Sequence, residues 1–156
     1  MSPEAVTIVR TDPGHRDVRW CVERYFAEID RRFETGFDVA DGAGEPPEIY
    51  APPSGVVLVA RRGDDPVGCG ALTIRADGFA EIKRMWVSDP VRGTGLGQRL
   101  LESLENFASE AGQSVVRLDS NRVLAEAHAL YRRNGYAEIP RYNDNPYAHI
   151  WFEKHI

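Results

Sequence analysis

One stretch of the chain, from Phe79 to Gly112, most limits what this sequence can fold into. It reads as a strand, a glycine-rich turn and an amphipathic helix in succession. The predicted strand, Ala80–Val87, lies between turn signals at Asp77-Gly78 and Ser88-Asp89-Pro90. After the turn, apolar residues recur at the helical period, and Gly112 stands where a C-terminal cap is expected. The apolar stripe consists of Leu96, Leu100, Leu101, Leu104, Phe107, Ala108 and Ala111.

The turn, Arg92-Gly93-Thr94-Gly95-Leu96-Gly97, has three glycines at alternate positions where the helix begins. Glycines let backbone N–H groups approach a ligand, and the first-turn amides of a helix have no partner within it. Together with the helix dipole, these amides favour an anion such as phosphate or pyrophosphate. The alternative is a tight turn in which the glycines serve only the backbone geometry. Three glycines preceded by an arginine favour the anion site.

Two well-known phosphate motifs fit this turn poorly. A nucleoside-triphosphate loop ends in Gly-Lys-Ser/Thr, and no such pair follows these glycines. The dinucleotide fingerprint Gly-x-Gly-x-x-Gly fits Gly93 and Gly95, and Asp119 could supply its acidic residue. Its third glycine, however, would fall at Gln98, and several residues separate the strand from the glycines. The match to dinucleotide-binding proteins is therefore partial.

The same residues resemble the acyl-coenzyme A binding motif of the GNAT N-acetyltransferase superfamily. Its pattern, Gln/Arg-x-x-Gly-x-Gly/Ala, is met by Arg92–Gly97. The segments EIKRMWV, from Glu81, and ALYRRNGYAEI, from Ala129, are similar to the family's central strand and its Leu-Tyr-x-x-x-Gly-Phe/Tyr segment. The resemblance covers about residues 56 to 156. It implies a mixed α+β fold, a mostly antiparallel sheet of about six or seven strands with about four flanking helices, and two parallel strands splayed at the coenzyme site.

The rest of the chain supplies elements that such a fold needs. The predicted strands are Ala5–Arg10, Val56–Arg61, Val67–Ile74, Val115–Asp119, Tyr136–Pro140 and Tyr147–Lys154. Two predicted helices run from Thr11-Asp12-Pro13 to about Phe33, and from about Val123 to Arg133. Since a helix connects Ala80–Val87 to Val115–Asp119, these two strands are expected to be parallel neighbours.

The segment Glu34–Gly55 differs from the rest of the chain because it is acidic and rich in glycine and proline. It is long for a structureless loop in a compact domain, which suggests a surface excursion or a loop that covers substrate. The resemblance places this region on the acceptor side of the fold. The candidate substrate contacts in it are Phe37, Asp38, Glu45, Glu48 and Tyr50.

Composition excludes several other classes of protein. The 156 residues suffice for one core, so residues 1–156 are expected to form a single domain. The formal net charge of −5 disfavours nucleic-acid binding, and no apolar run approaches the roughly 18 residues of a membrane span. The N-terminus does not read as a secretory signal. Two cysteines and four histidines without metal-ligand spacing predict a cytoplasmic protein that uses no metal.

The resemblance also implies which residues bind acetyl-coenzyme A, the expected cosubstrate. Backbone amides of Arg92–Gly97 are predicted to hold its pyrophosphate. A backbone amide of the central strand near Trp86 or Val87 is predicted to donate to the oxyanion that forms at the thioester. Asn121 is a further candidate for a hydrogen bond to the coenzyme. The complete predicted set is Met85, Trp86, Val87, Arg92, Gly93, Thr94, Gly95, Leu96, Gly97, Gln98, Asn121 and Tyr131.

Two residues are predicted to transfer protons. Tyr131 matches the family's Leu-Tyr position, and a phenol, with an ordinary pKa near 10, stays protonated until the departing thiolate needs a proton. Glu81 resembles a central-strand carboxylate that accepts the proton of the amine through water. The alternatives are a core aromatic for Tyr131 and a structural partner of Lys83 or Arg84 for Glu81.

The predicted reaction is direct transfer of acetyl from acetyl-coenzyme A to a primary amine in a ternary complex. Phe37, Tyr142 and Asp144 are the predicted substrate contacts, because an aromatic beside a carboxylate can attract an ammonium group. The alternatives are a non-catalytic sensor of coenzyme A and a dinucleotide-binding oxidoreductase, for which too little chain follows Asp119. The acceptor amine stays open, and a homodimer is an expectation from the family alone.

Overall fold

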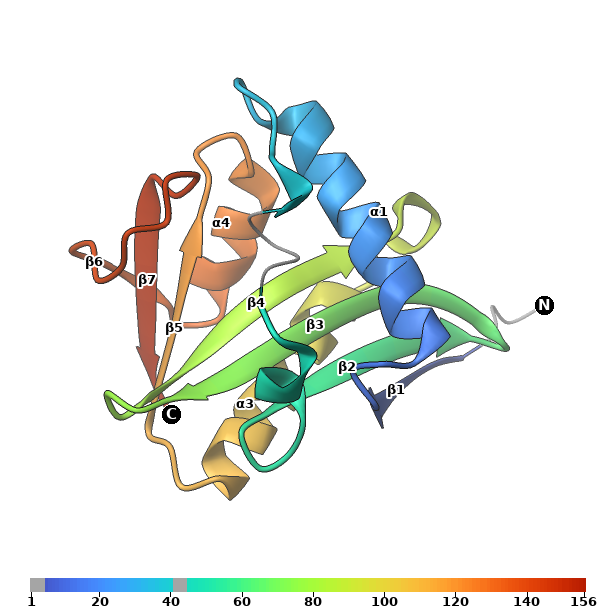
Figure 1. Ribbon diagram of the computed structural model, residues 1–156, viewed down its shortest axis with the longest axis horizontal. Helices are drawn as coiled ribbons and strands as arrows, with labels where there is room; N and C mark the ends of the chain where they lie inside the picture. The colour runs from blue at the N-terminus through green and yellow to red at the C-terminus, as the bar shows by residue number, and fades with distance from the viewer. Residues whose placement is uncertain (1–4, 41–44) are drawn as a thin grey trace.

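A computed structural model of the protein describes residues 5–40 and 45–156 (Figure 1). Its centre is a seven-stranded sheet in the order β1-β2-β3-β4-β5-β7-β6. The strands are β1 (Val6–Thr11), β2 (Gly55–Arg62), β3 (Asp65–Arg75), β4 (Phe79–Val87), β5 (Val115–Ser120), β6 (Ala137–Ile139) and β7 (Ile150–His155). The described residues also form the helices α1 (Arg16–Arg32), α3 (Leu96–Glu110) and α4 (Ala125–Arg133), and the 3₁₀ turns η1 (Pro47–Tyr50) and η2 (Asp89–Val91).

β2, β3 and β4 form an antiparallel meander, and β1 pairs antiparallel with the free edge of β2. β2 is buried on both faces. Val56 and Leu58 belong to the core cluster that contains α3, whereas Val57 and Val59 belong to the cluster that contains α1. This double burial explains the unbroken apolar run of β2, because a strand covered on both faces has no polar side to alternate with.

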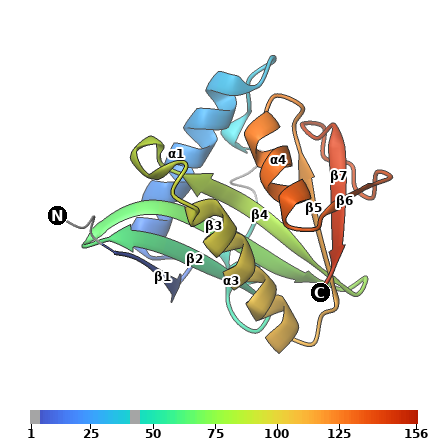
Figure 2. The ribbon, with the colours of Figure 1, turned by 180° about the vertical axis from the view of Figure 1, so that it is seen from behind.

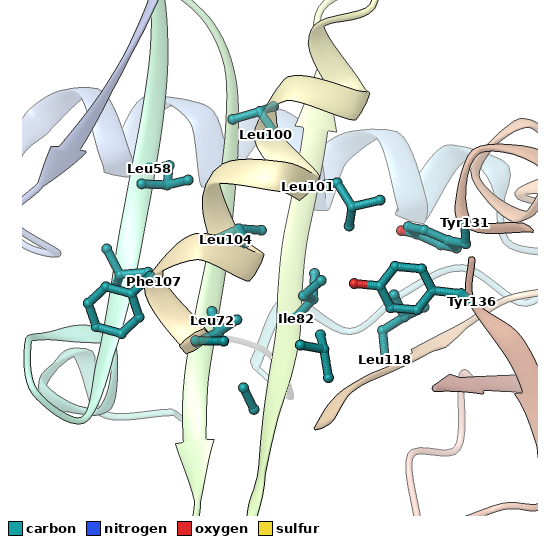
Figure 3. Packing of buried hydrophobic residues seen from close by; sticks show 14 of the residues in the cluster. Leu58, Leu72, Ile82, Leu100, Leu101, Leu104, Phe107, Leu118, Tyr131 and Tyr136 are labelled. Atoms are coloured by element: carbon teal, nitrogen blue, oxygen red, sulfur yellow. The ribbon is translucent and has the colours of Figure 1, made fainter. Parts of the chain in front are cut away.

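The helices form a layer on each face of the sheet. α1 and η1 lie on one face, and α3 and α4 lie on the other, as the two opposite views show (Figures 1 and 2). On the α3 side, Leu100, Leu101 and Leu104 are fully buried and belong to one core with Leu58 and Leu72 of the sheet (Figure 3). The helical stripe predicted from the sequence is therefore the side of α3 that packs on the sheet.

β4 and β5 are the two parallel strands, and they are paired only at their beginnings. The paired residues are Ala80 with Val116 and Glu81 with Arg117. Beyond these positions the strands diverge, although β4 continues to Val87 and β5 to Ser120 (Figure 1). β5 turns to its other neighbour, β7, with which it pairs along its whole length. The divergence opens the sheet between its central strands and makes room there for a ligand.

These observations confirm the predicted fold class and most predicted elements. The predicted start of the first helix was wrong: α1 begins at Arg16, after the N-cap residue His15. The Asp12 carboxylate instead accepts from the Gly14 amide at 2.7 Å, and the His15 amide donates to the Asp12 carbonyl. Because Pro13 favours the second position of such a turn, the Asp-Pro pair forms a turn before the helix and not its first residues.

The helix count also differs slightly from the expected one. About four helices were expected, whereas the described residues form three α-helices and two short 3₁₀ turns. One of these turns, η1, lies within the segment predicted as a surface excursion and buries Tyr50. Residues 41–44 of that segment lie outside the described residues. In residues 5–40 and 45–156, none of the helices combines the length and the apolar character that crossing a bilayer requires.

Candidate active site

A cleft of about 880 Å³ opens where β4 and β5 diverge. This volume lies within the range of small-molecule and cofactor sites. Of the residues predicted to form the site, those that do not line the cleft are Asp38, Glu48, Tyr50, Thr94 and Asp144. Those that do are Phe37, Glu45, Glu81, Met85, Trp86, Val87, Arg92, Gly93, Gly95, Leu96, Gly97, Gln98, Asn121, Tyr131 and Tyr142. The fold thus gathers around one space residues that are more than ninety positions apart in the sequence.

The glycine turn presents backbone amides to this cleft. Gly93 has φ +80° and Gly95, the N-cap of α3, has φ +87°. These are left-handed conformations that glycine adopts without steric cost. A Cβ atom at either position would meet no protein atom within 4 Å, so the space beside the turn is open. Because the first-turn amides of α3, those of Leu96, Gly97 and Gln98, have no partner inside the helix, the turn is suited to an anion.

Three residues of the predicted clamp have other roles as well. The Arg92 amide donates to the Asp89 carbonyl within the turn that ends η2, so it is engaged within the protein. Gly97 lies where α3 meets α4: a Cβ there would stand 3.1 Å from Cδ2 of Leu130. Gly97 therefore permits close approach of the two helices, which the sequence motif does not reveal. The Thr94 hydroxyl donates to the Val91 carbonyl, and Thr94 does not line the cleft.

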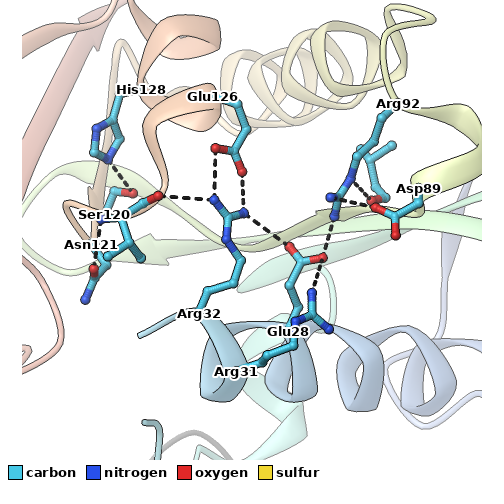
Figure 4. Close-up of polar contacts among 11 residues, drawn as sticks. Glu28, Arg31, Arg32, Asp89, Arg92, Ser120, Asn121, Glu126 and His128 are labelled. Carbon is cyan, nitrogen blue, oxygen red and sulfur yellow. Dashed lines mark hydrogen bonds and ion pairs between the residues drawn. The ribbon is translucent and has the colours of Figure 1, made fainter. Parts of the chain in front are cut away.

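The Arg92 side chain begins a chain of ion pairs that extends to α4 (Figure 4). Its guanidinium contacts Asp89 at 2.7 Å and also pairs with Glu28 of α1. Glu28 lies 3.7 Å from Arg32, which pairs with Glu126 in the first turn of α4. Hydrogen bonding to Glu126 raises the pKa of Arg32 further above its usual value. The chain connects the glycine turn, α1 and α4 along the wall of the cleft.

A bulge in β4 shapes the middle of the cleft. Arg84 has φ +57°, a left-handed conformation that costs a non-glycine residue about 1–2 kcal/mol. The β3–β4 register shifts at this point, between the pairs Cys69–Trp86 and Ala71–Lys83. Beyond the bulge, Met85 packs toward the α3 core, while Trp86 faces α1 and meets the Trp20 ring edge-on at 5.8 Å. The bulge interrupts the regular β3–β4 pairing next to the backbone predicted to bind the thioester oxygen.

Tyr131 lies in α4 with its ring packed beside Tyr136 and Phe152, at centroid distances of 6.0 and 5.7 Å (Figure 3). It is 8% exposed and reaches the cleft wall. Among the described residues, its hydroxyl has no hydrogen-bond partner. Burial, followed by the nearby charge of Asp119, raises the pKa of Tyr131 well above the usual value for a phenol. The hydroxyl is therefore protonated at neutral pH, and no described residue uses it in a hydrogen bond.

Glu81 is held in a polar network of which the sequence predicted only the contact with Lys83. It is only 4% exposed, and Tyr142 donates to its Oε2 at 2.6 Å. Asn143 lies beside both: its amide contacts Glu81 Oε2 at 3.4 Å and Asp119 Oδ2 at 2.6 Å. Lys83 lies 3.6 Å from Glu81. Burial, then the charge of Glu81, raises the pKa of Tyr142, so Tyr142 stays a donor.

The remaining predicted contacts differ in how well they fit. Phe37 lines the cleft and also packs on Phe26 and Tyr147, at centroid distances of 5.3 and 4.7 Å. The Asn121 side chain donates to the Tyr147 carbonyl and accepts from the Val123 amide, so it already stabilises the protein's own turns. Asp144 is exposed and does not line the cleft. A direct contact of Asp144 with bound substrate therefore has no support from this geometry.

Tyr25 is a cleft residue that is absent from the set predicted from the sequence. It lies on α1 and lines the cleft, and burial, followed by the proximity of Tyr131, raises its pKa. The two phenols therefore face the same space from opposite helices. No local signal distinguishes Tyr25 from the other aromatics of α1, because only the divergence of β4 and β5 exposes that part of the helix. The contacts of Asn143 with Glu81 and Asp119 were not predicted for a similar reason, since these partners are far away in the sequence.

Comparison with known proteins identifies the family. A family profile described as "Acetyltransferase (GNAT) domain" matches residues 53–138. The chain belongs to the GNAT acetyltransferase family. It is 37% identical over 134 residues to a protein named IAA acetyltransferase from Azospirillum brasilense, and 85% of each chain is covered. This relationship confirms the resemblance on which the site prediction rested.

Solved structures of the GNAT family share the fold. A GNAT acetyltransferase from Staphylococcus aureus matches with a TM-score of 0.82 at 18% identity, over 97% of this chain and 99% of its own. A second, from Elizabethkingia anophelis, was solved with acetyl-CoA bound and matches with a TM-score of 0.66 at 15% identity, over 97% and 98% of the two chains. At these identities the likeness concerns the fold alone. Within the described ranges, no three metal-ligating side chains come together.

Proposed function

We propose that this GNAT protein is an N-acetyltransferase that transfers acetyl from acetyl-CoA directly to a primary amine. The observation that carries the proposal is the position of the glycine turn, beside the divergence of β4 and β5 and in the same cleft as Tyr131 and Glu81. The turn offers amides for a pyrophosphate, and the cleft leads from it to a buried carboxylate. A structural turn alone would not require an open cleft of this size.

In the proposed reaction, the uncharged amine attacks the thioester carbon. Free alkyl amines have pKa values of about 10, so the amine must first lose a proton. Glu81 accepts this proton through water, and the carbon–nitrogen bond forms. A backbone amide near Trp86 or Val87 stabilises the oxyanion. When the carbon–sulfur bond breaks, the thiolate takes the proton of the Tyr131 hydroxyl. The nitrogen carries one proton more than the amide product, and it gives that proton through solvent to the Tyr131 phenolate, while Glu81 releases its own proton to solvent.

The contacts of Glu81 and Tyr131 suit these roles. The Tyr131 hydroxyl has no partner among the described residues and a raised pKa, so it is protonated at neutral pH and can donate to the departing sulfur. Glu81 is anchored by Tyr142 on Oε2, and its Oε1 atom lies toward Lys83 at 3.6 Å. Asp119 shares Asn143 with Glu81 and is the alternative base. Comparing Glu81→Gln with Asp119→Asn would identify which carboxylate is required.

A sensor of coenzyme A is the second candidate, because the glycine turn would serve binding without transfer. The buried carboxylate of Glu81 and the Tyr131 hydroxyl, which no described residue uses in a hydrogen bond, line one cleft and favour an enzyme, since a sensor needs neither group. A dinucleotide-binding oxidoreductase is disfavoured because the sheet is mostly antiparallel and has a single parallel pair.

The proposal is tested with purified protein, isotope-labelled acetyl-CoA and a mixed pool of primary amines. Free thiol and labelled products are followed together, and Gly95→Asp serves as the control for the coenzyme site. We expect a labelled amide to appear in step with thiol release in the wild-type protein and not in the variant. Binding of acetyl-CoA without any product would favour the sensor. Absence of acetyl-CoA binding would overturn the assignment of the glycine turn.

A further inference from the structure

Two cations stand side by side in the cleft because of the bulge in β4. In a regular strand, consecutive side chains point to opposite faces. The left-handed residue Arg84 breaks this alternation, so Lys83 and Arg84 both face the side of the sheet covered by α1 and η1. Both contact Glu45, and both line the cleft. Trp86, whose backbone is predicted to bind the thioester oxygen, lies only two residues from Arg84.

The carboxylate of Glu45 lies at the meeting point of three groups. Tyr50 donates its hydroxyl to Glu45 at 3.0 Å, Lys83 Nζ lies at 3.3 Å, and the Arg84 guanidinium lies at 3.7 Å. The Arg84 guanidinium is also stacked over the rings of Tyr50 and Phe26, at 4.9 and 5.4 Å from their centroids. Aromatic faces hold a guanidinium in place, which fixes its position beside Glu45.

These distances are long for the strongest ion pairs. Charge-assisted hydrogen bonds between cations and carboxylates are usually about 2.7–2.9 Å, and an arginine often makes two in parallel. Neither cation has such a bond to Glu45. The three groups are also sheltered, since the side chains of Lys83 and Arg84 are 29% and 17% exposed. A second carboxylate that entered the cleft could therefore displace Glu45 and make shorter bonds to the same groups.

We propose that Lys83, Arg84 and the Tyr50 hydroxyl form a carboxylate-binding subsite, which Glu45 occupies when no substrate is bound. The acceptor amine then carries a carboxylate of its own, as an amino acid does. This inference rests on the proposed transferase function and adds the substrate class. Two residues of a strand span about 7 Å, so a short amino acid bound at Arg84 can extend its amine toward the backbone of Trp86.

The test measures binding and not turnover, so that it is independent of catalysis. The probes are the N-acetyl derivatives of the twenty common amino acids, of β-alanine and of γ-aminobutyrate, each compared with its primary amide. Their dissociation constants are measured calorimetrically with coenzyme A present. We expect at least one acid to bind ten-fold or more tightly than its amide. Equal affinity for acid and amide throughout the panel would overturn the subsite.

Three variants of the full chain separate the subsite from general electrostatics. Lys83→Gln is expected to weaken the binding of the acids at least ten-fold and to leave the amides unchanged. Glu45→Gln removes the internal competitor, so it is expected to strengthen the acids several-fold. A purely structural role of Glu45 would weaken both. Arg75→Gln is the matched control, because Arg75 lines the same cleft but is not one of the described contacts of Glu45. The acid-to-amide ratio of this variant should equal that of the wild type.

The two proposals fail in different ways. If acids bind as expected but no labelled acetyl is transferred to any amine, the subsite holds and the transferase function fails. If acetyl is transferred to amines irrespective of a carboxylate, the function holds and the subsite is wrong. Weaker binding of acids to Glu45→Gln than to the wild type would also refute the subsite, since it would make Glu45 a binding group and not a competitor.

Discussion

Replacing Tyr131 by Phe separates chemistry from packing in this cleft. The change removes one oxygen atom and keeps the ring, which packs between Tyr136 and Phe152. Because the hydroxyl has no hydrogen bond to another described residue, its loss leaves no protein group unsatisfied. The free energy of unfolding should change by less than about 1 kcal/mol. If the hydroxyl protonates the departing thiolate, kcat should fall by about 100-fold to 10,000-fold.

Tyr136→Phe is the matched control, because it makes the same chemical change in the neighbouring ring. The Tyr136 hydroxyl donates to Oε2 of Glu105 at 2.8 Å and does not line the cleft. A hydrogen bond to a charged group contributes about 1.5–3 kcal/mol, so this variant should lose stability of that order and keep its kcat. Urea unfolding and thiol-release kinetics at saturating substrates give both quantities.

The two variants should therefore show opposite effects. Tyr131→Phe should have a low kcat and a nearly unchanged free energy of unfolding, whereas Tyr136→Phe should keep its kcat and lose stability. Titration calorimetry with acetyl-CoA is the third measurement, and we expect Tyr131→Phe to change the dissociation constant by no more than about two-fold. Full turnover in Tyr131→Phe would refute its role as the acid. A fall in acetyl-CoA affinity as large as the fall in kcat would show that Tyr131 positions the coenzyme and does not supply a proton.

Three further predictions follow from the same structure. Gly95→Asp should weaken acetyl-CoA binding by more than ten-fold in a calorimetric titration, because it adds negative charge beside the proposed pyrophosphate site; an unchanged affinity would contradict the clamp. Leu104→Ala should lower the free energy of unfolding in urea by about 2–5 kcal/mol, because Leu104 is fully buried, and a loss below 1 kcal/mol would contradict its place in the core. Five tyrosines have raised pKa values, caused mainly by burial, so the unfolded chain releases their protons first; they are Tyr25, Tyr50, Tyr131, Tyr136 and Tyr142. Stability should be intact below about pH 10 and then fall by roughly 7 kcal/mol per pH unit, and a flat profile of unfolding free energy between pH 9 and 11 would refute their burial.

Local patterns in the sequence predicted much of this protein correctly. The strand–turn–helix from Phe79 to Gly112 was recognisable because its periodicity and glycines depend only on neighbouring residues. The same holds for the strands predicted at Val56–Arg61 and Val67–Ile74 and for the predicted end of the last helix at Arg133. The start of α1 was wrong because Asp12-Pro13 can begin either a turn or a helix. Local residues do not decide between the two.

The catalytic surroundings depend on residues that only the fold brings together. Glu81 receives its strongest hydrogen bond from Tyr142, sixty-one positions later, and Asn143 connects it to Asp119. No sequence spacing predicts these contacts, because β7 must first pair with β5 to bring the segment before it to the cleft.

The sequence by itself therefore determined the order of strands and helices along the chain, the core face of α3 and the glycine turn, since those depend on interactions within a few residues. Only the tertiary structure decided where β4 and β5 separate and that Lys83 and Arg84 face the same side. The physical reason is that a bulge and a splayed pair of strands are properties of strand pairing. β4 pairs with β3 along one edge, and β5 pairs with β7 along its whole length, so β4 and β5 pair with each other only at their beginnings.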